Sequence, residues 1–377
     1  MEFQFFAPYR ICPIGAHVDH QHGLITGFAI DKGVTLECEP TDDGTVLITS
    51  GDFDGVVSFN VKQPPAELLH DWGDFVRGAA YVLKECNLKR GMRGRIVGSL
   101  PIGGLSSSAA VILCYLRALM QFNDVEVDDA ALIELALRVE KGYAGVNVGK
   151  LDQSCEVLSK KDHLLFLDTA DQSFELIKTP DNMPKHQLMI FYSGLSRKLG
   201  AGFNLRVDEL RAAGWYLLGL GGMDRNPFSK TRLRDVPVEL FDAYQHQLPV
   251  PFMRRARHFY TECERVRQGA DAWRRGDIKT FGELVFQSGK SSIEDYETGS
   301  EHLIELYNQL RHAPGVYGGR FSGAGFKGCC IAIVDHDKVD DCERFVTDNY
   351  LRKYPMLEGA YSVHRCDSEN GVGRDNS

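Results

Sequence analysis

The sequence contains no apolar run close to the roughly 18 residues that a membrane-spanning helix needs, so we expect no association with a membrane. Basic residues are in the minority, with 43 Lys and Arg against 52 Asp and Glu and a net charge of −9. Nucleic-acid binding relies on clustered Lys and Arg, and this balance therefore argues against a nucleic-acid partner. It leaves room for a small anionic substrate, because a pocket can be locally positive in an acidic protein.

Signals for secretion and for a disulfide framework are also missing. The first residues include no basic segment, and Pro8 comes too early for a secretory signal peptide. The ten cysteines are scattered along the chain without a CxxC pair, which favours buried thiols in a reducing compartment. We expect a cytoplasmic protein that is a monomer or a weak dimer.

Two common phosphate-binding signatures are absent as well. Gly289, Lys290 and Ser291 look like the end of a Walker loop, but the first glycine that the motif requires would fall on Leu284. The dinucleotide fingerprint G-x-G-x-x-G is missing too. A phosphate site in this chain must therefore use another kind of loop.

The composition is otherwise typical of a soluble globular protein: 377 residues, 43% of them hydrophobic and 25% charged. Helical patterns cover residues 109–122, 128–142 and much of 204–310, and strand patterns cover 34–39, 45–50, 164–167, 187–192 and the two ends of 320–335. Runs of strands followed by helices predict an α+β fold with two lobes. We place an N-terminal lobe at 1–185, a C-terminal lobe at 186–366 and a flexible polar tail at 367–377.

The strongest chemical signal is the segment 100–111, where an apolar strand end leads into two glycines, three serines and an apolar helix. The first turn of a helix has backbone N–H groups without partners and a partial positive charge. Gly103 and Gly104 allow a ligand to approach the backbone, and the hydroxyls of Ser106, Ser107 and Ser108 add donors. The alternative is a simple serine N-cap, for which one serine would suffice. We interpret the segment as a phosphate-binding loop.

A second segment, residues 8–23, crowds Arg10, His17, Asp19, His20 and His22 together. The histidines and the aspartate are possible metal ligands, as in a zinc or two-metal site. A His-rich substrate-binding loop is the more ordinary interpretation, since no second ligand cluster stands out elsewhere. For the arginine, the alternative role is a surface ion pair, which would contribute little.

Two further segments carry candidate groups. Asp152 follows a turn that contains Gly149, and it is either a helix cap or a general base for a hydroxyl nucleophile. Glu140 ends an apolar-patterned helix, where a carboxylate is ordinary on a solvated face. The glycine-rich segment 318–334, with Gly323 and Gly325, is either a tight turn or a loop that packs against a nucleotide site.

In their order along the chain, the four segments together resemble the signature motifs of the GHMP small-molecule kinases. Arg10 to Asp19 resembles the R-x-x-x-x-G-x-H-x-D signature of the galactokinase branch, which transfers the γ-phosphate of ATP to a sugar C1 hydroxyl. Segments 72–78 and 291–297 also look like galactokinase segments. The resemblance implies a first lobe related to the ribosomal S5 domain-2-like fold and a ferredoxin-like second lobe.

The resemblance also implies roles for individual residues. Asp152 would be the catalytic aspartate with Arg10 beside it, and Mg²⁺ would bind near Ser108 and Glu140. The implied ATP-binding residues are Trp72, Gly103, Gly104, Leu105, Ser106, Ser107, Ser108, Ala109, Gly323 and Gly325. The implied substrate-binding residues are Ala16, His17, Asp19, Gly149 and Phe203. Phosphoryl transfer asks mainly for positioning and electrostatics, so this set is sufficient.

Departures from the galactokinase pattern narrow the substrate. Galactokinases have a Glu, which binds the sugar O6, where this chain has Ala16, and a Tyr where it has Phe203. The serine loop is also one residue shorter. Ala16, the shortened loop and the segments 202–206 and 313–326 all look like the galacturonokinase branch. A Glu facing the carboxylate of a uronic acid at about 4 Å would cost roughly 4 kcal/mol at an effective dielectric constant of 20. That is roughly a thousandfold in affinity, and Ala16 removes the clash.

Several alternatives remain open at this level. Ala16 supplies no cation for a substrate carboxylate; His17, His20 and Lys150 are candidates, although Lys150 is more ordinary as an exposed lysine. A kinase for a neutral sugar such as galactose also tolerates Ala16. A sugar sensor without catalysis need not keep the phosphoryl-transfer residues, and a metal-dependent hydrolase would be built on the histidines.

Overall fold

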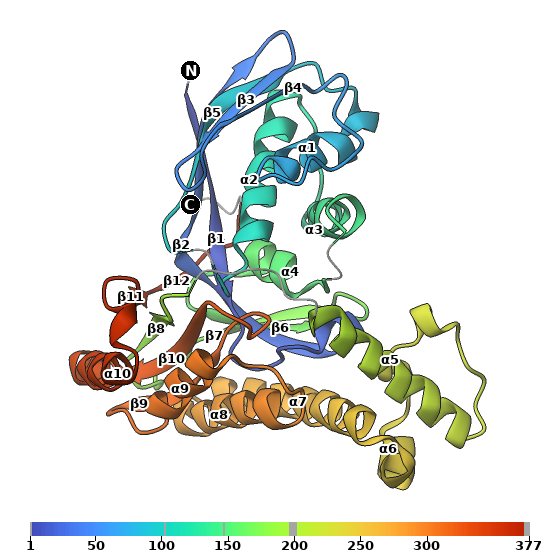
Figure 1. The fold of residues 1–377 in the computed structure, drawn as a ribbon, viewed down its shortest axis with the longest axis vertical. Helices are drawn as coiled ribbons and strands as arrows, with labels where there is room; N and C mark the ends of the chain where they lie inside the picture. Colours follow the sequence, from blue (N-terminus) through green and yellow to red (C-terminus); the bar gives the residue numbers. More distant parts are fainter. Residues whose placement is uncertain (1, 102, 146–147, 196–201, 373–377) are drawn as a thin grey trace.

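The computed structural model describes residues 2–101, 103–145, 148–195 and 202–372, which form two β-sheets with helices packed against them (Figure 1). The larger sheet holds β1 (Phe3–Ile11), β2 (Leu24–Thr41), β3 (Thr45–Ser50), β4 (Val56–Asn60), β5 (Gly91–Gly98), β6 (His163–Asp168), β7 (Phe174–Lys178) and β12 (Ser368–Glu369). The smaller sheet holds β8 (His186–Tyr192), β9 (Val316–Phe321), β10 (Cys329–Asp335) and β11 (Ser362–Cys366).

Strand β2 organises the larger sheet because it is long enough to pair with several others. It runs antiparallel to β1, to β5 near its end and to β6 near its start. Only β3 and β5 pair in parallel among the described strands. The strands predicted at 34–39, 45–50 and 164–167 are confirmed as parts of β2, β3 and β6.

Four helices cover one face of this sheet: α1 (Asp74–Val82), α2 (Ser107–Phe122), α3 (Asp129–Leu137) and α4 (Leu151–Leu158) (Figure 1). Helix α2 is buried almost all round, as its apolar sequence predicts, and contacts β1, β2 and α1. Asp128 caps α3 by accepting a hydrogen bond of 2.7 Å from the Ala131 amide. The regular helix is shorter than predicted, because residues 138–143 form a wider π-helical turn.

The smaller sheet is covered by α8 (Ile278–Glu294), α9 (Glu301–Leu310) and α10 (Val339–Lys353). The long helix α7 (Val250–Arg274) packs against α8 and also against β2, β6 and β7 of the larger sheet. Its Trp273 is fully buried between Phe28 of β2 and Phe281 of α8, with ring centroids 5.3 and 4.9 Å away. Helices α5 (Gly202–Leu220) and α6 (Val238–Tyr244) complete this side. The two sheets are therefore joined by a shared apolar core.

The change from one sheet to the other falls between β7, which ends at Lys178, and β8, which begins at His186. The boundary at residue 185 stays a prediction. No helix in the described part of the chain is long and apolar enough to cross a bilayer.

The expected flexible tail is wrong for residues 367–372. Strand β12 pairs with Ile30 and Ala29 of β2, and the amide of Gly371 donates a 2.7 Å hydrogen bond to the carbonyl of Ser159. Val372 is buried against the same lobe. This strand could not be predicted from its polar sequence. It is held by backbone hydrogen bonds, which residues with any side chain can form. Residues 373–377 lie outside the described ranges.

Candidate active site

The loop between β5 and α2 has the geometry of an anion site. Gly103, Gly104 and Ser106 have φ angles of 148°, 82° and 65°, so the backbone favours glycine at all three positions, and Ser106 is the one that is not a glycine. Ser106 occupies the N-cap of α2, but its side chain makes no capping hydrogen bond. The capping role considered from the sequence is therefore not met, and Ser107, Ser108 and Ala109 form an open first turn.

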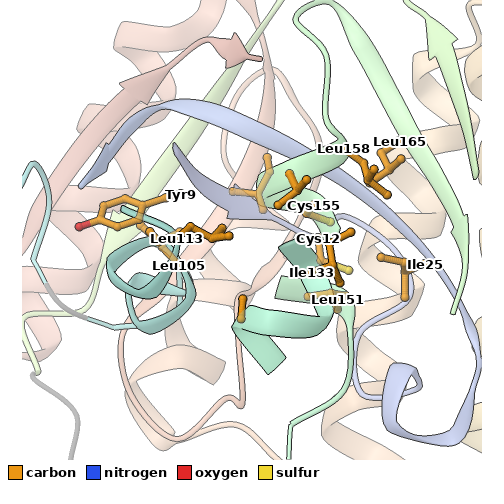
Figure 2. Close-up of a cluster of buried hydrophobic side chains, with 14 of the residues drawn as sticks. Tyr9, Cys12, Ile25, Leu105, Leu113, Ile133, Leu151, Cys155, Leu158 and Leu165 are labelled. Carbon is orange, nitrogen blue, oxygen red and sulfur yellow. The ribbon is translucent and has the colours of Figure 1, made fainter. Parts of the chain in front are cut away.

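The glycine-serine loop packs against a buried apolar cluster on one side and against the glycine-rich segment 318–334 on the other. Leu105 belongs to a buried cluster with Tyr9 of β1 and with Leu151 and Cys155 of α4 (Figure 2). On its other side lies the glycine-rich segment. A Cβ on Gly323 would lie 2.9 Å from the Gly104 Cα, and one on Gly328 would lie 2.7 Å from the Gly103 carbonyl carbon. The two backbones thus touch at positions where only glycine fits. Gly325, with a φ of 80°, shapes the same turn beside Phe321.

Arg10 and Asp152 form a buried ion pair beside this loop. The Nε and Nη2 atoms of Arg10 both donate to Asp152 Oδ1, at 2.8 and 2.7 Å. The remaining nitrogen, Nη1, donates to the Gly104 carbonyl at 3.1 Å and to Ser322 Oγ at 3.4 Å. Burial disfavours the charge on Arg10, but Asp152 outweighs it, and the pKa of Arg10 lies above its usual value. The surface ion pair considered for Arg10 is excluded, since its side chain is 4% exposed.

Ser108 and Glu140 meet on the other side of the loop. Ser108 Oγ donates to Glu140 Oε1 at 2.7 Å, and Gln153 Nε2 donates to Oε2 at 2.5 Å. Glu140 is buried within the π-helical turn, so it does not occupy a solvated face. A hydroxyl and a carboxylate held together are the oxygen donors that Mg²⁺ prefers, and the residues present therefore fit that ion.

Asp19 lies next to the turn that precedes Asp152. The Leu151 amide donates to Asp19 Oδ2 at 3.2 Å, and a Cβ on Gly149 would lie only 2.1 Å from the same oxygen. Burial, and then the charge of Asp152, raise the pKa of Asp19 to about 6. The structure thus brings together Asp19, Gly149 and Asp152, as the resemblance implies.

Ala16 and His17 lie on the same loop as Asp19. Ala16 is half-buried, and its carbonyl bonds to His258 Nε2 at 3.0 Å. The ring of His17 stacks on Tyr296, with centroids 4.3 Å apart and planes 11° apart. Burial, and then the charge of Arg320, hold the pKa of His17 well below its usual value. His17 is therefore neutral at physiological pH and does not offer a full cation to a substrate carboxylate.

Comparison with known proteins identifies the family of this chain. Residues 74–160 match the GHMP kinases N terminal domain, and residues 270–352 match the GHMP kinases C terminal family. The galacturonokinase of Arabidopsis thaliana is 40% identical over an alignment that covers 96% of this chain and 91% of the relative. The chain belongs to the GHMP kinase family.

Other relatives agree with this assignment. The galactokinase of Halalkalibacterium halodurans is 31% identical over 97% of this GHMP kinase and 92% of the relative. The crystal structure of Lactococcus lactis galactokinase complexed with galactose has a TM-score of 0.88 and 28% identity, covering 99% of this chain and 95% of that one. The Methanococcus jannaschii mevalonate kinase, 16% identical with a TM-score of 0.67 and 98% coverage of both chains, shares the fold. The predicted α+β fold of a GHMP kinase is confirmed.

Two predicted site residues are not joined to the others by described contacts. Trp72 donates its indole N–H to the Asp54 carbonyl at 3.0 Å and stacks on Phe53. Phe203 belongs to α5, but its side chain lies outside the described residues. Among the described residues, no three His, Cys, Asp or Glu side chains gather in a way that would hold a metal ion. The two-metal and zinc interpretations of the histidines therefore have no geometric support.

Some residues of this GHMP kinase site were not predicted from the sequence. Gln153 directly follows Asp152, and Ser322 lies beside Gly323 in the glycine-rich segment 318–334, and that adjacency was a usable signal. Glu156, one helical turn after Asp152, is fully buried, and Ser106 is the hydrogen-bonding side chain beside its carboxylate. Burial, and then the charge of Asp152, raise the pKa of Glu156 well above its usual value. Arg211 and Arg232, which line a cavity with Asp19, carried no motif at all.

Proposed function

We propose that this GHMP kinase transfers the γ-phosphoryl group of ATP to the anomeric hydroxyl of a uronic acid, D-galacturonate, to give D-galacturonate 1-phosphate. The observation that carries the proposal is the buried Arg10–Asp152 pair, held directly against the glycine-serine loop through the Gly104 carbonyl. It supports the proposal because a carboxylate that can serve a hydroxyl nucleophile lies next to a backbone with the geometry of an anion site. The full-length likeness to a galacturonokinase supports the choice of substrate.

Asp152 acts as the proton acceptor in this mechanism. Arg10 holds Oδ1 with two hydrogen bonds, and no donor to Oδ2 is recorded in the described part of the chain. Oδ2 accepts the proton of the C1 hydroxyl as the sugar oxygen bonds to the γ-phosphorus and the bond from that phosphorus to the ADP oxygen breaks. Arg10 orients the carboxylate and adds positive charge where the transferred phosphoryl group is most negative.

The loop binds the phosphate chain through its backbone. The open first turn of α2 offers N–H groups at Ser107, Ser108 and Ala109 and the positive end of the helix dipole. Gly103 and Gly104 keep the approach free of side chains. Ser108 and Glu140 are the residues that would hold Mg²⁺, which neutralises phosphate charge when bound. Gln153 keeps the Glu140 carboxylate in position.

The absence of a carboxylate at Ala16 favours an acidic sugar. A uronic acid carries a negative charge where galactose has its C6 hydroxyl, and a Glu at this position would repel it by roughly 4 kcal/mol at 4 Å and a dielectric constant of 20. Asp19 remains available to accept hydrogen bonds from sugar hydroxyls, and Gly149, which has no Cβ, packs directly against its Oδ2. Phosphorylation of a neutral sugar is the second candidate, because galactokinases are also similar over the full chain.

The setting of the enzyme is part of the same proposal. All ten cysteines are free and only Cys86 is exposed, which supports a reducing, cytoplasmic location. The monomeric or weakly dimeric state stays a prediction.

The test is ADP release with Mg·ATP and a panel of D-galacturonate, D-glucuronate, D-galactose and L-arabinose. Turnover of galacturonate with little turnover of galactose supports the proposal. Turnover mainly of a neutral sugar keeps the kinase and refutes the acidic substrate. Sugar binding without ADP release from any of the four refutes catalysis on this panel and favours a sensor.

A further inference from the structure

A cavity of about 300 Å³ lies beside the proposed sugar site and shares two residues with it. Asp19 and Gly149 both line the cavity, and both belong to the substrate-binding set. Its volume is at the lower end of the range for small-molecule sites, which suits a single sugar. The phosphate loop, residues 103–109, does not line it, so an anion held here is not the phosphate chain of ATP.

The wall of this cavity is strongly positive for a protein of net charge −9. Five cationic side chains line it: Arg138, Lys141, Lys150, Arg211 and Arg232. Only two carboxylates accompany them, Asp19 and Glu134, and Glu134 is already paired with Lys150. The remaining excess of positive charge faces one small cavity, which is the electrostatic signature of an anionic ligand.

Two of these cations, Arg211 and Arg232, are half-buried and lack full partners. Arg211, on α5, is 14% exposed, and its carboxylate partner Asp208 is itself 53% exposed. Arg232 donates to the backbone carbonyls of Ser229 and Thr231, at 2.9 and 2.8 Å, and forms no ion pair within the described residues. The Nε atom of each arginine is buried and lacks a hydrogen-bond partner. A buried N–H without a partner is costly, so each arginine keeps hydrogen-bonding capacity that the protein itself does not satisfy.

The cations also repel one another. Burial, and then the charge of Arg211, lower the pKa of Arg232. A fold that holds like charges together in this way gains stability when an anion binds between them.

We propose that this cavity binds the carboxylate of the uronic acid substrate, with Arg211 and Arg232 as its charged partners. The inference rests on the proposed function and adds the positive charge that Ala16 cannot supply. Ala16 removes a repulsive charge from the loop, and the two arginines provide the attractive one. Specificity for an acidic sugar then comes both from the missing negative charge at Ala16 and from the positive charge of the arginines. A neutral sugar leaves the arginines without an anionic partner.

The test compares Arg211→Gln, Arg232→Gln and Arg232→Lys with the wild type by titration calorimetry against D-galacturonate and D-galactose. A charged hydrogen bond contributes enough that each Gln variant is expected to bind galacturonate at least about tenfold more weakly, with galactose affinity changed less than about threefold. Arg232→Lys keeps the charge and retains most of the affinity. Arg267→Gln is the matched control, since it removes one charge from an exposed ion pair with Glu264 away from the cavity. Circular dichroism confirms that each variant is folded.

Equal weakening of the two sugars, or unchanged galacturonate affinity in both Gln variants, overturns the proposal. Acetate serves as a carboxylate probe in the wild type. Competition between acetate and galacturonate supports the assignment, and acetate binding without competition assigns the cavity to a free anion and overturns it.

The proposed kinase activity and the proposed carboxylate site can be refuted independently. A wild type that binds galacturonate through the arginines but releases no ADP refutes the proposed function alone. A wild type that turns over galacturonate while both Gln variants keep its affinity refutes the carboxylate site alone.

Discussion

Replacing Asp152 with Ala would leave the Arg10 guanidinium charged in the interior without its carboxylate. The Arg10 side chain is 4% exposed and that of Asp152 is 21% exposed, so the pair is far from the surface regime in which an ion pair contributes about 0–1 kcal/mol. Removal of one partner from a buried pair costs roughly 3–5 kcal/mol. Because Gly104 and Ser322 still accept from Arg10, we expect the lower end, about 3 kcal/mol of unfolding free energy.

The assay is a double-mutant cycle by urea denaturation with Asp152→Ala, Arg10→Met and the double variant. Arg10→Met removes the buried charge itself, so the double variant should be more stable than Asp152→Ala alone. A loss below about 1 kcal/mol for Asp152→Ala, or a coupling energy near zero, would refute the view that this pair is buried and mutually dependent.

The same cycle separates stability from catalysis. Asp152→Asn keeps the shape of the side chain but cannot accept a proton, and we expect turnover to fall by about 10²–10⁴-fold while ATP affinity is largely kept. Near-normal turnover in a folded Asp152→Asn enzyme would contradict the role given to this carboxylate.

Three further predictions follow from other groups of the site. Ala16→Glu should weaken galacturonate binding by about a thousandfold through like-charge repulsion, measured as KM and Kd. Because Asp19 must be ionised to accept from sugar hydroxyls and its pKa is about 6, kcat/KM should fall as the pH drops below about 6, and Asp19→Asn should lose this acidic limb. Glu156 is protonated in the folded state because its pKa is raised, so its contribution to stability is present below the unfolded pKa and is lost as pH rises towards the folded one. Glu156→Gln should therefore gain stability relative to the wild type as the pH rises above the unfolded pKa of about 4.5, measured by thermal unfolding.

Each of these has a result that would count against it. Unchanged galacturonate affinity in Ala16→Glu would show that the substrate acid lies elsewhere. An acidic limb that persists in Asp19→Asn would belong to another group. A pH-independent stability difference for Glu156→Gln would mean that this carboxyl group does not titrate on unfolding.

Local patterns predicted much of the fold and the core of the site. The apolar segment that became α2 and the alternating strand β3 carry their structure in their own residues, and so does the glycine-serine loop. The Arg10–Asp152 and Ser108–Glu140 pairs were expected only through the family resemblance, because residues so distant in sequence meet by topology.

Other features could not be predicted for the same reason. In the sequence, Arg211 and Arg232 have no pattern that distinguishes them from surface arginines. The fold of α5 and of the segment after it brings both to the cavity that Asp19 lines. The π-helical turn that buries Glu140 depends on the packing of α1 and α2 around it and has no pattern of its own.

The pairing of β12 with β2 has a consequence for how this chain is made. At about 5–20 residues per second, the ribosome finishes β12 roughly 15–65 s after β2 has been synthesised. During that interval Ala29 and Ile30 pair with β1 on one side but lack β12 on the other, because the whole second sheet is an insertion within the first lobe. A fragment cut at residue 185 would therefore be an unfinished sheet, and the two lobes reach their final state together.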